Sequence, residues 1–216
     1  MISINIASLP ERKEQLIKTI DSIINQVDIV NVCLNGYDHN PYIHDKVNVV
    51  FSDNRYGDGG KFLFLEDFDG YYLTLDDDLI VGETYVKDMI ASIDAYKIVS
   101  HHGKTHIKFP IESYYRTPSL RYRCLGENKI TEPVMFCGTG CLGFHTKTIR
   151  PPLEIFNPIN MADIHFSIYA DSLNIPIWVL SHPHNYFKYQ DVPNTIWEQK
   201  NNDDKVETDI VNKYFT

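Results

Sequence analysis

Short apolar segments alternate with amphipathic ones through the first hundred residues, and this alternation constrains the fold more than any other feature. Ile2, Ile4 and Ile6 alternate with smaller side chains, which is typical of a strand. The next segment carries apolar residues at helical spacing: Leu16, Ile17, Ile20, Ile23, Ile24 and Val27. Two further strands are predicted at 29–34 and 47–51. Strand, helix and strand at this spacing indicate a parallel βαβ unit, and hence an α/β fold.

Local signals mark the ends of these elements and predict the next ones. Ser8 and Glu11 stand in S-x-x-E spacing, which predicts a capping box at the start of the first helix. A short helix is expected at 61–67, followed by strands at 71–75 and 96–99. Between those strands lies a second amphipathic helix with one apolar face: Val86, Met89, Ile90 and Ile93.

Composition excludes several classes of protein. The 216 residues are 43% hydrophobic, which is enough to bury a core. Asp and Glu outnumber Lys and Arg by 29 to 20, so the net charge is −9, and without a basic run nucleic acid is not an expected partner. Four scattered cysteines without a CxxC pair favour a reduced, intracellular setting. No signal peptide or long apolar run is visible, so we expect a cytoplasmic protein whose membrane contact, at the inner face, is at most peripheral.

The second half of the chain is less regular than the first. Residues 101–129 are polar, aromatic and basic without a clean period, which indicates loops and hairpins over a site. A strand pair is expected at 133–144, a helix from about Met161 and a strand at 175–180.

The chain shows no internal repeat, low-complexity block or linker. We therefore predict one domain over residues 1–216. Its parts are a nucleotide-binding half (1–100), an acceptor and catalytic half (101–193) and a polar tail (194–216).

Three consecutive acids, Asp76, Asp77 and Asp78, follow the predicted strand at 71–75. Ligands of open α/β sheets bind beyond the carboxyl ends of the strands, so these carboxylates stand where a ligand would lie. Adjacent carboxylates repel one another unless a cation offsets their charge, and Mn²⁺ or Mg²⁺ prefers carboxylate and phosphate oxygens. A nucleoside diphosphate would supply the phosphates. The alternative interpretation is a solvated acidic turn before the next helix.

Three segments of the chain carry a resemblance to a known family. They are the opening INIASLPER at 4–12, the turn GDGGK at 57–61 and the acidic triplet at 76–78. Together they resemble the GT-A-type glycosyltransferases, most closely the family 2-like enzymes that use nucleotide sugars, with the triplet in the place of the DxD motif. The resemblance covers about the first hundred residues well and the rest more loosely. It implies a single GT-A-like domain with a Rossmann-like, mixed, mostly parallel central sheet flanked by helices.

The same resemblance implies a nucleotide-sugar site in the first half. The loop after the first strand, with Ala7, Ser8 and Leu9, would lie against the nucleotide, as would Arg12. Asn35 stands at the exit of the second strand, where the family often has an acid for the base. This departure leaves the identity of the base open.

The glycine-rich turn and the acidic triplet complete the implied donor site. Asp58 and Lys61 would lie near the nucleotide, with Lys61 neutralising diphosphate charge; the alternative is a turn with a surface lysine. Asp76 would face the ribose or a metal ion, Asp77 would line the same site, and Asp78 would be the direct ligand of Mn²⁺ or Mg²⁺.

The segment Gly138, Thr139 and Gly140, flanked by Cys137 and Cys141, resembles the stretch that approaches the donor sugar and acceptor in these enzymes. Small residues there permit close backbone approach. The alternative is a β-bulge or tight bend. If the segment is one extended strand, its two sulfurs lie about 13 Å apart at roughly 3.3 Å per residue, too far to share a zinc ion.

Asp163 opens a predicted helix and matches the place where the family has an acid near the acceptor. In an inverting transfer it would be the general base that takes the proton of the acceptor hydroxyl. The alternative is an acid that only stabilises the helix N-terminus.

His182 and His184 follow the last predicted strand. In a subset of GT-A enzymes a C-terminal histidine completes the metal shell, so either could be a ligand and would favour a retaining mechanism. The alternative is a surface or structural role.

An aromatic and basic cluster in the second half suits an acceptor groove, because aromatic faces pack on sugar rings and arginine binds anions. Its members are Tyr114, Tyr115, Arg116, Arg121, Tyr122 and Arg123. The alternative is that these residues pack a hairpin against the sheet.

These observations predict a metal-dependent glycosyltransferase that moves a monosaccharide from a nucleoside diphosphate sugar, with UDP favoured, to a hydroxyl of a glycan or lipid-linked acceptor in surface polysaccharide synthesis. Two alternatives remain open, a sugar-1-phosphate nucleotidyltransferase and a non-catalytic module that binds nucleotide or carbohydrate. The oligomeric state is left open.

Overall fold

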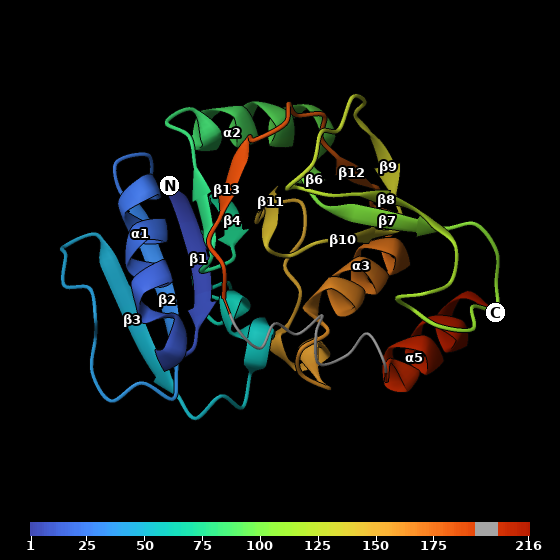
Figure 1. Cartoon of the computed structure of the whole chain (residues 1–216), viewed down its shortest axis with the longest axis horizontal. Coiled ribbons are helices and arrows are strands. Elements are labelled where there is room, and N and C mark those ends of the chain that lie inside the picture. Colours follow the sequence, from blue (N-terminus) through green and yellow to red (C-terminus); the bar gives the residue numbers. More distant parts are fainter. Residues whose placement is uncertain (193–202) are drawn as a thin grey trace.

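Eight strands form the central sheet of the computed structural model, which describes residues 1–192 and 203–216 (Figure 1). Their order across the sheet is β3-β2-β1-β4-β11-β6-β12-β9. Their bounds are β1 Ile2–Ser8, β2 Ile29–Asn35, β3 Val47–Ser52, β4 Tyr71–Leu75, β6 Ile98–Ser100, β9 Glu132–Val134, β11 Cys141–His145 and β12 Ile177–Val179. Strands from both halves of the chain therefore share one sheet.

The pairing makes this sheet mixed but mostly parallel, as the sequence predicts. β1 pairs in parallel with β2 and β4, β2 with β3, and β6 with β12. β11 is antiparallel to β4 and β6, and β9 is antiparallel to β12. The carboxyl ends of β1, β2, β3 and β4 consequently meet at one edge of the sheet. β11 begins at that same edge because it runs in the opposite direction.

Helices and two smaller sheets surround the central sheet. The smaller sheets have the orders β10-β7-β8 and β13-β5. Their strands are β5 Leu79–Val81, β7 Gly103–His106, β8 Ser119–Tyr122, β10 Phe136–Cys137 and β13 Phe187–Tyr189. The helices are α1 Lys13–Ile23, α2 Tyr85–Tyr96, α3 Ala162–Ser172 and α5 Lys205–Phe215, and the 3-10 turns are η1 Pro10–Arg12, η2 Gly57–Phe62 and η3 Leu153–Phe156. The predicted tail, 194–216, lies partly outside the described residues, and its described end forms α5.

Apolar side chains are buried on both faces of the central sheet. On one face, Ile4 and Ile6 of β1 share a cluster with residues of α1 and α2: Leu16, Ile20, Val86 and Met89. On the other face, aromatic residues from η2, β4, β11, η3 and α3 gather: Phe62, Tyr72, Phe144, Phe156 and Phe166. Complete burial of one such side chain stabilises the fold by about 1.5–3 kcal/mol. The strand ends that form the site are therefore carried by a rigid, double-sided core.

A ladder of asparagine amides crosses the parallel part of the sheet. Asn48 donates to the Oδ1 atom of Asn31 at 3.2 Å, and Asn31 donates to that of Asn5 at 2.8 Å. Asn5 in turn donates to the backbone oxygen of Leu73 at 2.8 Å. Buried polar groups are costly unless paired, so the ladder favours one register of β1, β2, β3 and β4. This register aligns the strand ends at the site.

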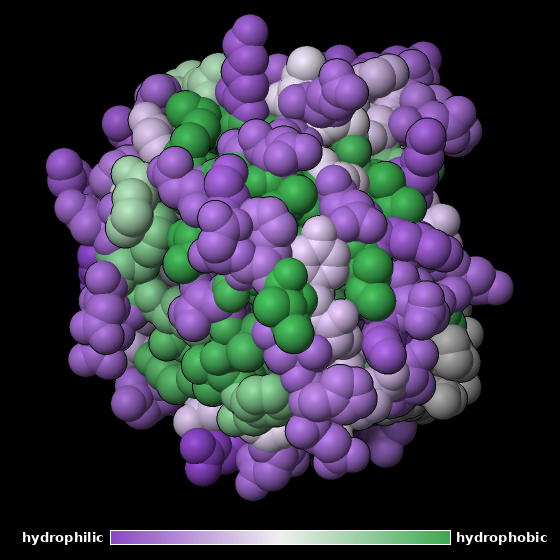
Figure 2. Space-filling view, turned by 90° about the vertical axis from the view of Figure 1, so that its left-hand side faces the viewer, coloured by the Kyte–Doolittle hydropathy of each residue, from purple (hydrophilic) through white to green (hydrophobic). Residues whose placement is uncertain are grey.

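β3 lies at the edge of the central sheet and carries apolar side chains that reach the surface. Figure 2 shows hydrophobic side chains between polar ones on this side of the molecule. Val50 and Phe51 of β3 are 39% and 50% exposed. Isolated exposed apolar residues are normal on protein surfaces and need no ligand to explain them. Among the described residues, no helix is both long and apolar enough to cross a lipid bilayer.

Two local predictions are wrong. The Ser8 hydroxyl does not cap α1: its Oγ atom lies 3.1 Å from the Tyr37 hydroxyl, and the cap residue Arg12 makes no side-chain capping bond. Pro10 opens the 3-10 turn η1 first, which separates Ser8 from the α-helix. At 61–67 the expected helix is absent, because the glycine-rich segment instead forms the 3-10 turn η2.

Two smaller corrections concern later segments of the chain. β6 begins at Ile98 rather than Tyr96, because α2 continues through Tyr96. Cys137 and Cys141 do not share one extended strand: the first ends β10 and the second begins β11. The intervening glycines form a bend, which is the alternative that the sequence left open.

Candidate functional site

A cavity of about 750 Å³ lies where the carboxyl ends of β1, β2 and β4 meet the start of β11. It is lined by every residue that the sequence assigns to the nucleotide sugar: Ala7, Ser8, Leu9, Arg12, Asn35, Asp58, Lys61, Asp76, Asp77, Gly138, Thr139 and Gly140. Asp78 and Asp163 line the same cavity. A volume of this size accommodates a nucleotide-sized ligand. The structure therefore brings together residues that are up to 156 positions apart in the chain, from Ala7 to Asp163.

The register of β4 and β11 explains how Asp76 meets the glycine segment. Leu75, the last residue of β4, is opposite Cys141, the first of β11. The next pair is Asp76 and Gly140, whose backbone N–H and carbonyl oxygen are 3.0 Å apart. A Cβ atom at Gly140 would lie 2.0 Å from the Oδ2 atom of Asp76. Glycine is required here because any side chain would displace the carboxylate.

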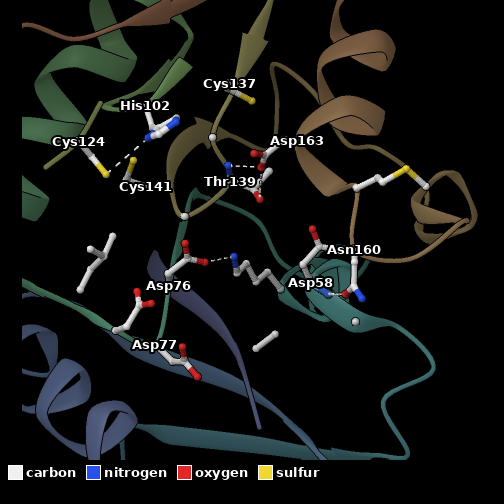
Figure 3. A pocket seen from close by; sticks show the side chains of 18 of the residues that line it. Asp58, Asp76, Asp77, His102, Cys124, Cys137, Thr139, Cys141, Asn160 and Asp163 are labelled. Carbon is white, nitrogen blue, oxygen red and sulfur yellow. Dashed lines mark hydrogen bonds and ion pairs between the residues drawn. The ribbon is translucent and has the colours of Figure 1, made fainter. Parts of the chain in front are cut away.

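The bend between β10 and β11 is held by three side chains. Ser100 donates to the backbone oxygen of Gly138 at 2.9 Å, and Thr74 donates to that of Thr139 at 2.5 Å. The Oδ1 atom of Asp163 accepts hydrogen bonds from the backbone N–H and the hydroxyl of Thr139, at 2.6 and 2.7 Å. Asp163 is thereby fixed at the first turn of α3, facing the cavity (Figure 3).

Lys61 and Asp76 form an ion pair at the centre of the site, in which the lysine is buried and the carboxylate is 44% exposed (Figure 3). Lys61 is 4% exposed, so the alternative of a surface lysine is excluded. Burial opposes the charge of Asp76, but the neighbouring Lys61 outweighs it and lowers the pKa of the carboxyl. The pair is therefore ionised, with the lysine charge directed at a carboxylate rather than at open cavity.

The other two acids of the triplet differ in their partners. Arg12 donates to the Oδ1 atom of Asp77 at 3.2 Å and lies 3.9 Å from the Oδ2 atom of Asp78. Burial, followed by the charges of Asp76 and Asp77, raises the pKa of Asp78 to about 8. Asp78 is thus the carboxylate of the triplet whose charge is compensated least.

Asp58 has a structural role that the sequence did not indicate. Its Oδ2 atom accepts a hydrogen bond at 2.9 Å from the backbone N–H of Ala162, the first residue of α3, while its own N–H donates to Asn160 at 3.3 Å. Burial raises the pKa of Asp58 to about 6. The carboxyl therefore fixes the start of the helix that presents Asp163.

Asn35, expected to face the base, lies at the end of β2 and lines the cavity. Its amide donates to the backbone oxygen of Gly57 at 3.2 Å, and its Oδ1 atom lies 3.3 Å from the Cys33 thiol. The side chain therefore also ties β2 to the glycine-rich turn η2.

The acceptor-side cluster lines the cavity only in part. Tyr114, Tyr115, Arg121 and Arg123 belong to the wall, whereas Arg116 and Tyr122 do not. Tyr122 packs against a buried apolar cluster, as the packing alternative predicts, whereas Arg116 is exposed.

Lys104, which no sequence motif marks, joins this wall. Its Nζ atom lies 3.0 Å from the ring centroid of Tyr114 and donates to that residue's backbone oxygen at 2.7 Å. Burial, with a smaller effect of Arg121, lowers the pKa of Lys104 to about 7. A cation held against an aromatic ring in this way is stabilised electrostatically.

Neither histidine predicted to bind metal lines the cavity. His182 is buried among aromatic rings, with centroids 5.4 Å from His101 and 5.8 Å from Tyr186. His184 is exposed. The structure thus does not bring these two side chains together with the acidic triplet.

The acidic triplet satisfies one part of what a divalent cation requires. It supplies carboxyl oxygens, among them a buried Oδ2 atom of Asp77 that has no hydrogen-bond partner, and a cation would favour ionisation of Asp78, whose pKa is otherwise raised to about 8. Within residues 1–192 and 203–216, however, no group of three His, Cys, Asp or Glu side chains forms a ready-made metal cage. A cation here would need further oxygen ligands from a diphosphate or from water.

Comparisons with known proteins place the fold. No protein-family model and no curated protein sequence matches this chain. The structure of S. aureus TarS, residues 1–349, in complex with UDP-GlcNAc superimposes with a TM-score of 0.53 at 17% identity, covering 92% of this chain and 61% of that one. Protein A197 from STIV superimposes with a TM-score of 0.48 at 18% identity, covering 90% of this chain and 87% of that one. The likeness to TarS shows the fold alone, and it confirms the GT-A-like arrangement that the sequence predicts.

Proposed function

We propose that this protein is a glycosyltransferase that moves a monosaccharide from a nucleoside diphosphate sugar to a hydroxyl group. One observation carries the proposal: Arg12, Lys61, the acidic triplet at 76–78 and Asp163 surround a single cavity at the carboxyl edge of a GT-A-like sheet. A crevice at this edge is where open α/β sheets bind ligands. The TarS structure of similar fold holds UDP-GlcNAc, which supports a UDP-sugar as the donor here.

The donor would occupy the side of the cavity formed by β1, β2 and β4. Ala7, Ser8 and Leu9 offer backbone and small side chains to the nucleoside, next to Asn35. Arg12 lies at the same wall, where its guanidinium could contact phosphate oxygens once its bond to Asp77 is shared. The leaving diphosphate develops negative charge during transfer, and preorganised cations stabilise such charge.

A divalent cation, Mn²⁺ or Mg²⁺, would be held by Asp78 with help from Asp76, and it would supply positive charge to the leaving diphosphate. Lys61 neutralises Asp76 from the opposite side, so this pair leaves Asp78 as the principal carboxylate for a cation. His182 and His184 lie outside the cavity and are not part of this proposed set.

The acceptor would occupy the side formed by β7, β8 and α3. Tyr115, half-buried in this wall, would present aromatic surface to a sugar ring of a glycan or lipid-linked acceptor. Tyr114 is 4% exposed and has Lys104 against its ring, so it would support Tyr115 from behind. Asp163 would take the proton of the acceptor hydroxyl as that oxygen attacks the anomeric carbon and the nucleoside diphosphate leaves, which gives inversion. Thr139 binds one carboxylate oxygen of Asp163 and thereby orients the other for the proton.

Turnover tests this proposal. The protein is incubated with Mn²⁺, a panel of UDP- and GDP-sugars, and mono- and disaccharide acceptors, and released nucleoside diphosphate is measured by chromatography. We expect release from one donor, reduced by about 10²–10⁴-fold in Asp163→Asn. The matched control is Asp171→Asn, an exposed acid on the same helix that lies outside the cavity.

Two outcomes would redirect the proposal. Formation of a nucleotide sugar and pyrophosphate from a nucleoside triphosphate and a sugar 1-phosphate would identify a nucleotidyltransferase. Donor binding without turnover of any panel member would indicate a binding module.

A further inference from the structure

Two thiols and an imidazole meet in the wall of the cavity on the side away from Asp77 (Figure 3). Cys124 follows β8, His102 precedes β7 and Cys141 begins β11. The Sγ atom of Cys124 lies 3.7 Å from the Nδ1 atom of His102. The Cys141 side chain lies beside that of Cys124 on the same wall of the cavity. Segments far apart in sequence therefore converge on one cysteine pair.

The bend that shapes the cavity also fixes this imidazole. The N–H of Gly138 donates to the backbone oxygen of His102 at 2.7 Å. A Cβ atom at Gly138 would lie 2.8 Å from the Cβ atom of His102, so the glycine lets the histidine pack directly on the bend. His102 is thereby packed on the bend beside Cys124, with its side chain still exposed to solvent.

The cysteines of the chain differ in how easily a reagent reaches them. Cys124 is half-buried and lines the open cavity. Cys141 is 1% exposed and its Sγ atom lies 3.7 Å from the Ser100 hydroxyl. Cys33 and Cys137 are 0% and 2% exposed. Of the four thiols, that of Cys124 is therefore the most accessible to an oxidant that enters the cavity.

The local environment also favours the thiolate of Cys124. A hydrogen bond from Cys141, followed by the neighbouring His102, lowers the pKa of Cys124 to about 5. Burial instead raises the pKa of Cys33, to about 11. Accessible thiolates with a second cysteine nearby are the arrangement typical of redox-sensitive sites, whereas buried thiols are inert.

We propose that Cys124 is a redox-active thiol that reacts with peroxides entering the cavity, and that Cys141 converts the product to an intramolecular disulfide. His102 first accepts the Cys124 proton. The Cys124 sulfur then attacks one oxygen of hydrogen peroxide, the O–O bond breaks, and the departing hydroxide takes a proton to become water. This leaves a sulfenic acid on Cys124.

The second step consumes the sulfenic acid. The Cys141 sulfur attacks the Cys124 sulfur, the S–O bond breaks, and the departing hydroxide takes the Cys141 proton to form a second water. The two thiols lose two electrons in total and one peroxide is reduced to two waters. The disulfide ties the segment after β8 to the first residue of β11, next to Gly140 and Asp76, so oxidation fixes one wall of the cavity. This inference does not depend on the proposed transferase activity.

Peptide mapping of the full chain tests the proposal without a variant. The reduced protein is exposed to a few equivalents of hydrogen peroxide, free thiols are blocked by alkylation, and the digest is analysed by mass spectrometry without reduction. We expect one dominant new species, a cross-linked pair of peptides containing Cys124 and Cys141. In a parallel experiment without peroxide, alkylation of Cys124 should be at least about tenfold faster than that of Cys33 or Cys137, and this difference should vanish in guanidinium chloride.

Two variants assign the separate roles. Cys141→Ser should stop the reaction at the Cys124 sulfenic acid, which dimedone traps. His102→Asn should slow alkylation of Cys124 by about tenfold near pH 6 and little at pH 9, a pH profile that a merely structural role would not produce. Circular dichroism confirms that each variant is folded.

Several results would overturn the inference. These are equal reactivity of all cysteines in the folded wild-type chain, a disulfide that joins other cysteines or two chains, or a stable sulfenic acid on Cys124 with Cys141 intact.

Discussion

Replacing Asp78 by asparagine should stabilise the metal-free protein relative to the wild type, and this gain in stability should grow as the pH rises. In the folded chain the pKa of Asp78 is raised to about 8, first by burial and then by Asp76 and Asp77. A carboxyl whose pKa is higher in the folded than in the unfolded state binds its proton more tightly when folded. Its ionisation therefore lowers stability progressively as the pH rises from the unfolded value of about 3.9 through the folded value.

The size of the effect follows from this difference in pKa. One pKa unit corresponds to about 1.4 kcal/mol, so Asp78 should lower the free energy of unfolding by up to about 4 kcal/mol between pH 5 and pH 8. We expect roughly half of this, because water and salt reach the cavity and screen the charges. Asp78→Asn should thus gain about 2 kcal/mol more at pH 8 than at pH 5. For a domain of this length that is about 4–8 °C in Tm.

Thermal melts of both proteins in EDTA at pH 5, 6, 7 and 8 measure the difference directly. Asp67→Asn, at an exposed acid outside the cavity, serves as the control and should show no such slope. Added Mn²⁺ with UDP should raise the Tm of the wild type by mass action and leave Asp78→Asn unchanged. A stability difference that is independent of pH, or a variant that is less stable at pH 8, would refute the electrostatic account of Asp78.

Three further predictions concern residues that hold the site in shape: Gly140, Lys61 and Asp58. Gly140→Ala should lower stability by about 1–3 kcal/mol and weaken UDP binding in calorimetry, because the added Cβ would lie 2.0 Å from the carboxylate of Asp76. The control is Gly82→Ala, whose added Cβ would have no atom within 4 Å and should change neither quantity. Lys61→Met should lower the free energy of urea unfolding by about 1–2 kcal/mol because Asp76 loses its cation; solvent limits the loss, since the Asp76 side chain is 44% exposed, and adding Asp76→Asn should restore part of it. Asp58→Asn should keep the hydrogen bond to α3. It should also remove the fall in stability between about pH 4 and pH 6 that the wild type shows because the pKa of Asp58 is raised to about 6. If Tm falls with pH in the variant as it does in the wild type, the fall does not come from Asp58.

The fold and the position of the acidic triplet at the strand ends could be predicted because their signals are local. Ile2, Ile4 and Ile6 alternate within one strand, and the three acids follow β4 directly in sequence. Parallel strands bring their carboxyl ends to one edge, so residues at several strand exits meet without any knowledge of side-chain packing. This argument placed the acidic triplet at that edge, whereas Ala7 and Asn35 were assigned to the site by the resemblance to GT-A-type glycosyltransferases.

The partners within the site could not be predicted because they depend on tertiary packing. Lys61 meets Asp76 only because η2 packs beneath the end of β4, and Asp58 caps α3 across 104 positions of sequence. Lys104 carries no motif, and its place in the wall follows from its contact with Tyr114. His182 satisfied a plausible ligand pattern, yet its strand end directs it into an aromatic cluster.

The neighbours of each cysteine could not be predicted from the sequence either. An extended strand would separate Cys137 from Cys141, and the bend that replaces it changes what lies beside each thiol. Cys124 approaches Cys141 only because the segment after β8 folds back over the cavity. Spacing in the sequence contains no information about that contact.

Calorimetric titration of the nucleotide tests the central claim most directly. UDP, GDP and CMP are titrated into the wild-type chain with Mn²⁺ and again with EDTA, with circular dichroism recorded on the same sample to confirm that the chain is folded. We predict saturable, metal-dependent binding of one nucleotide, with UDP favoured, and its loss in Asp78→Ala. Absence of binding by all three nucleotides to the folded protein, or binding that is equal in EDTA, would contradict the donor site proposed at the acidic triplet.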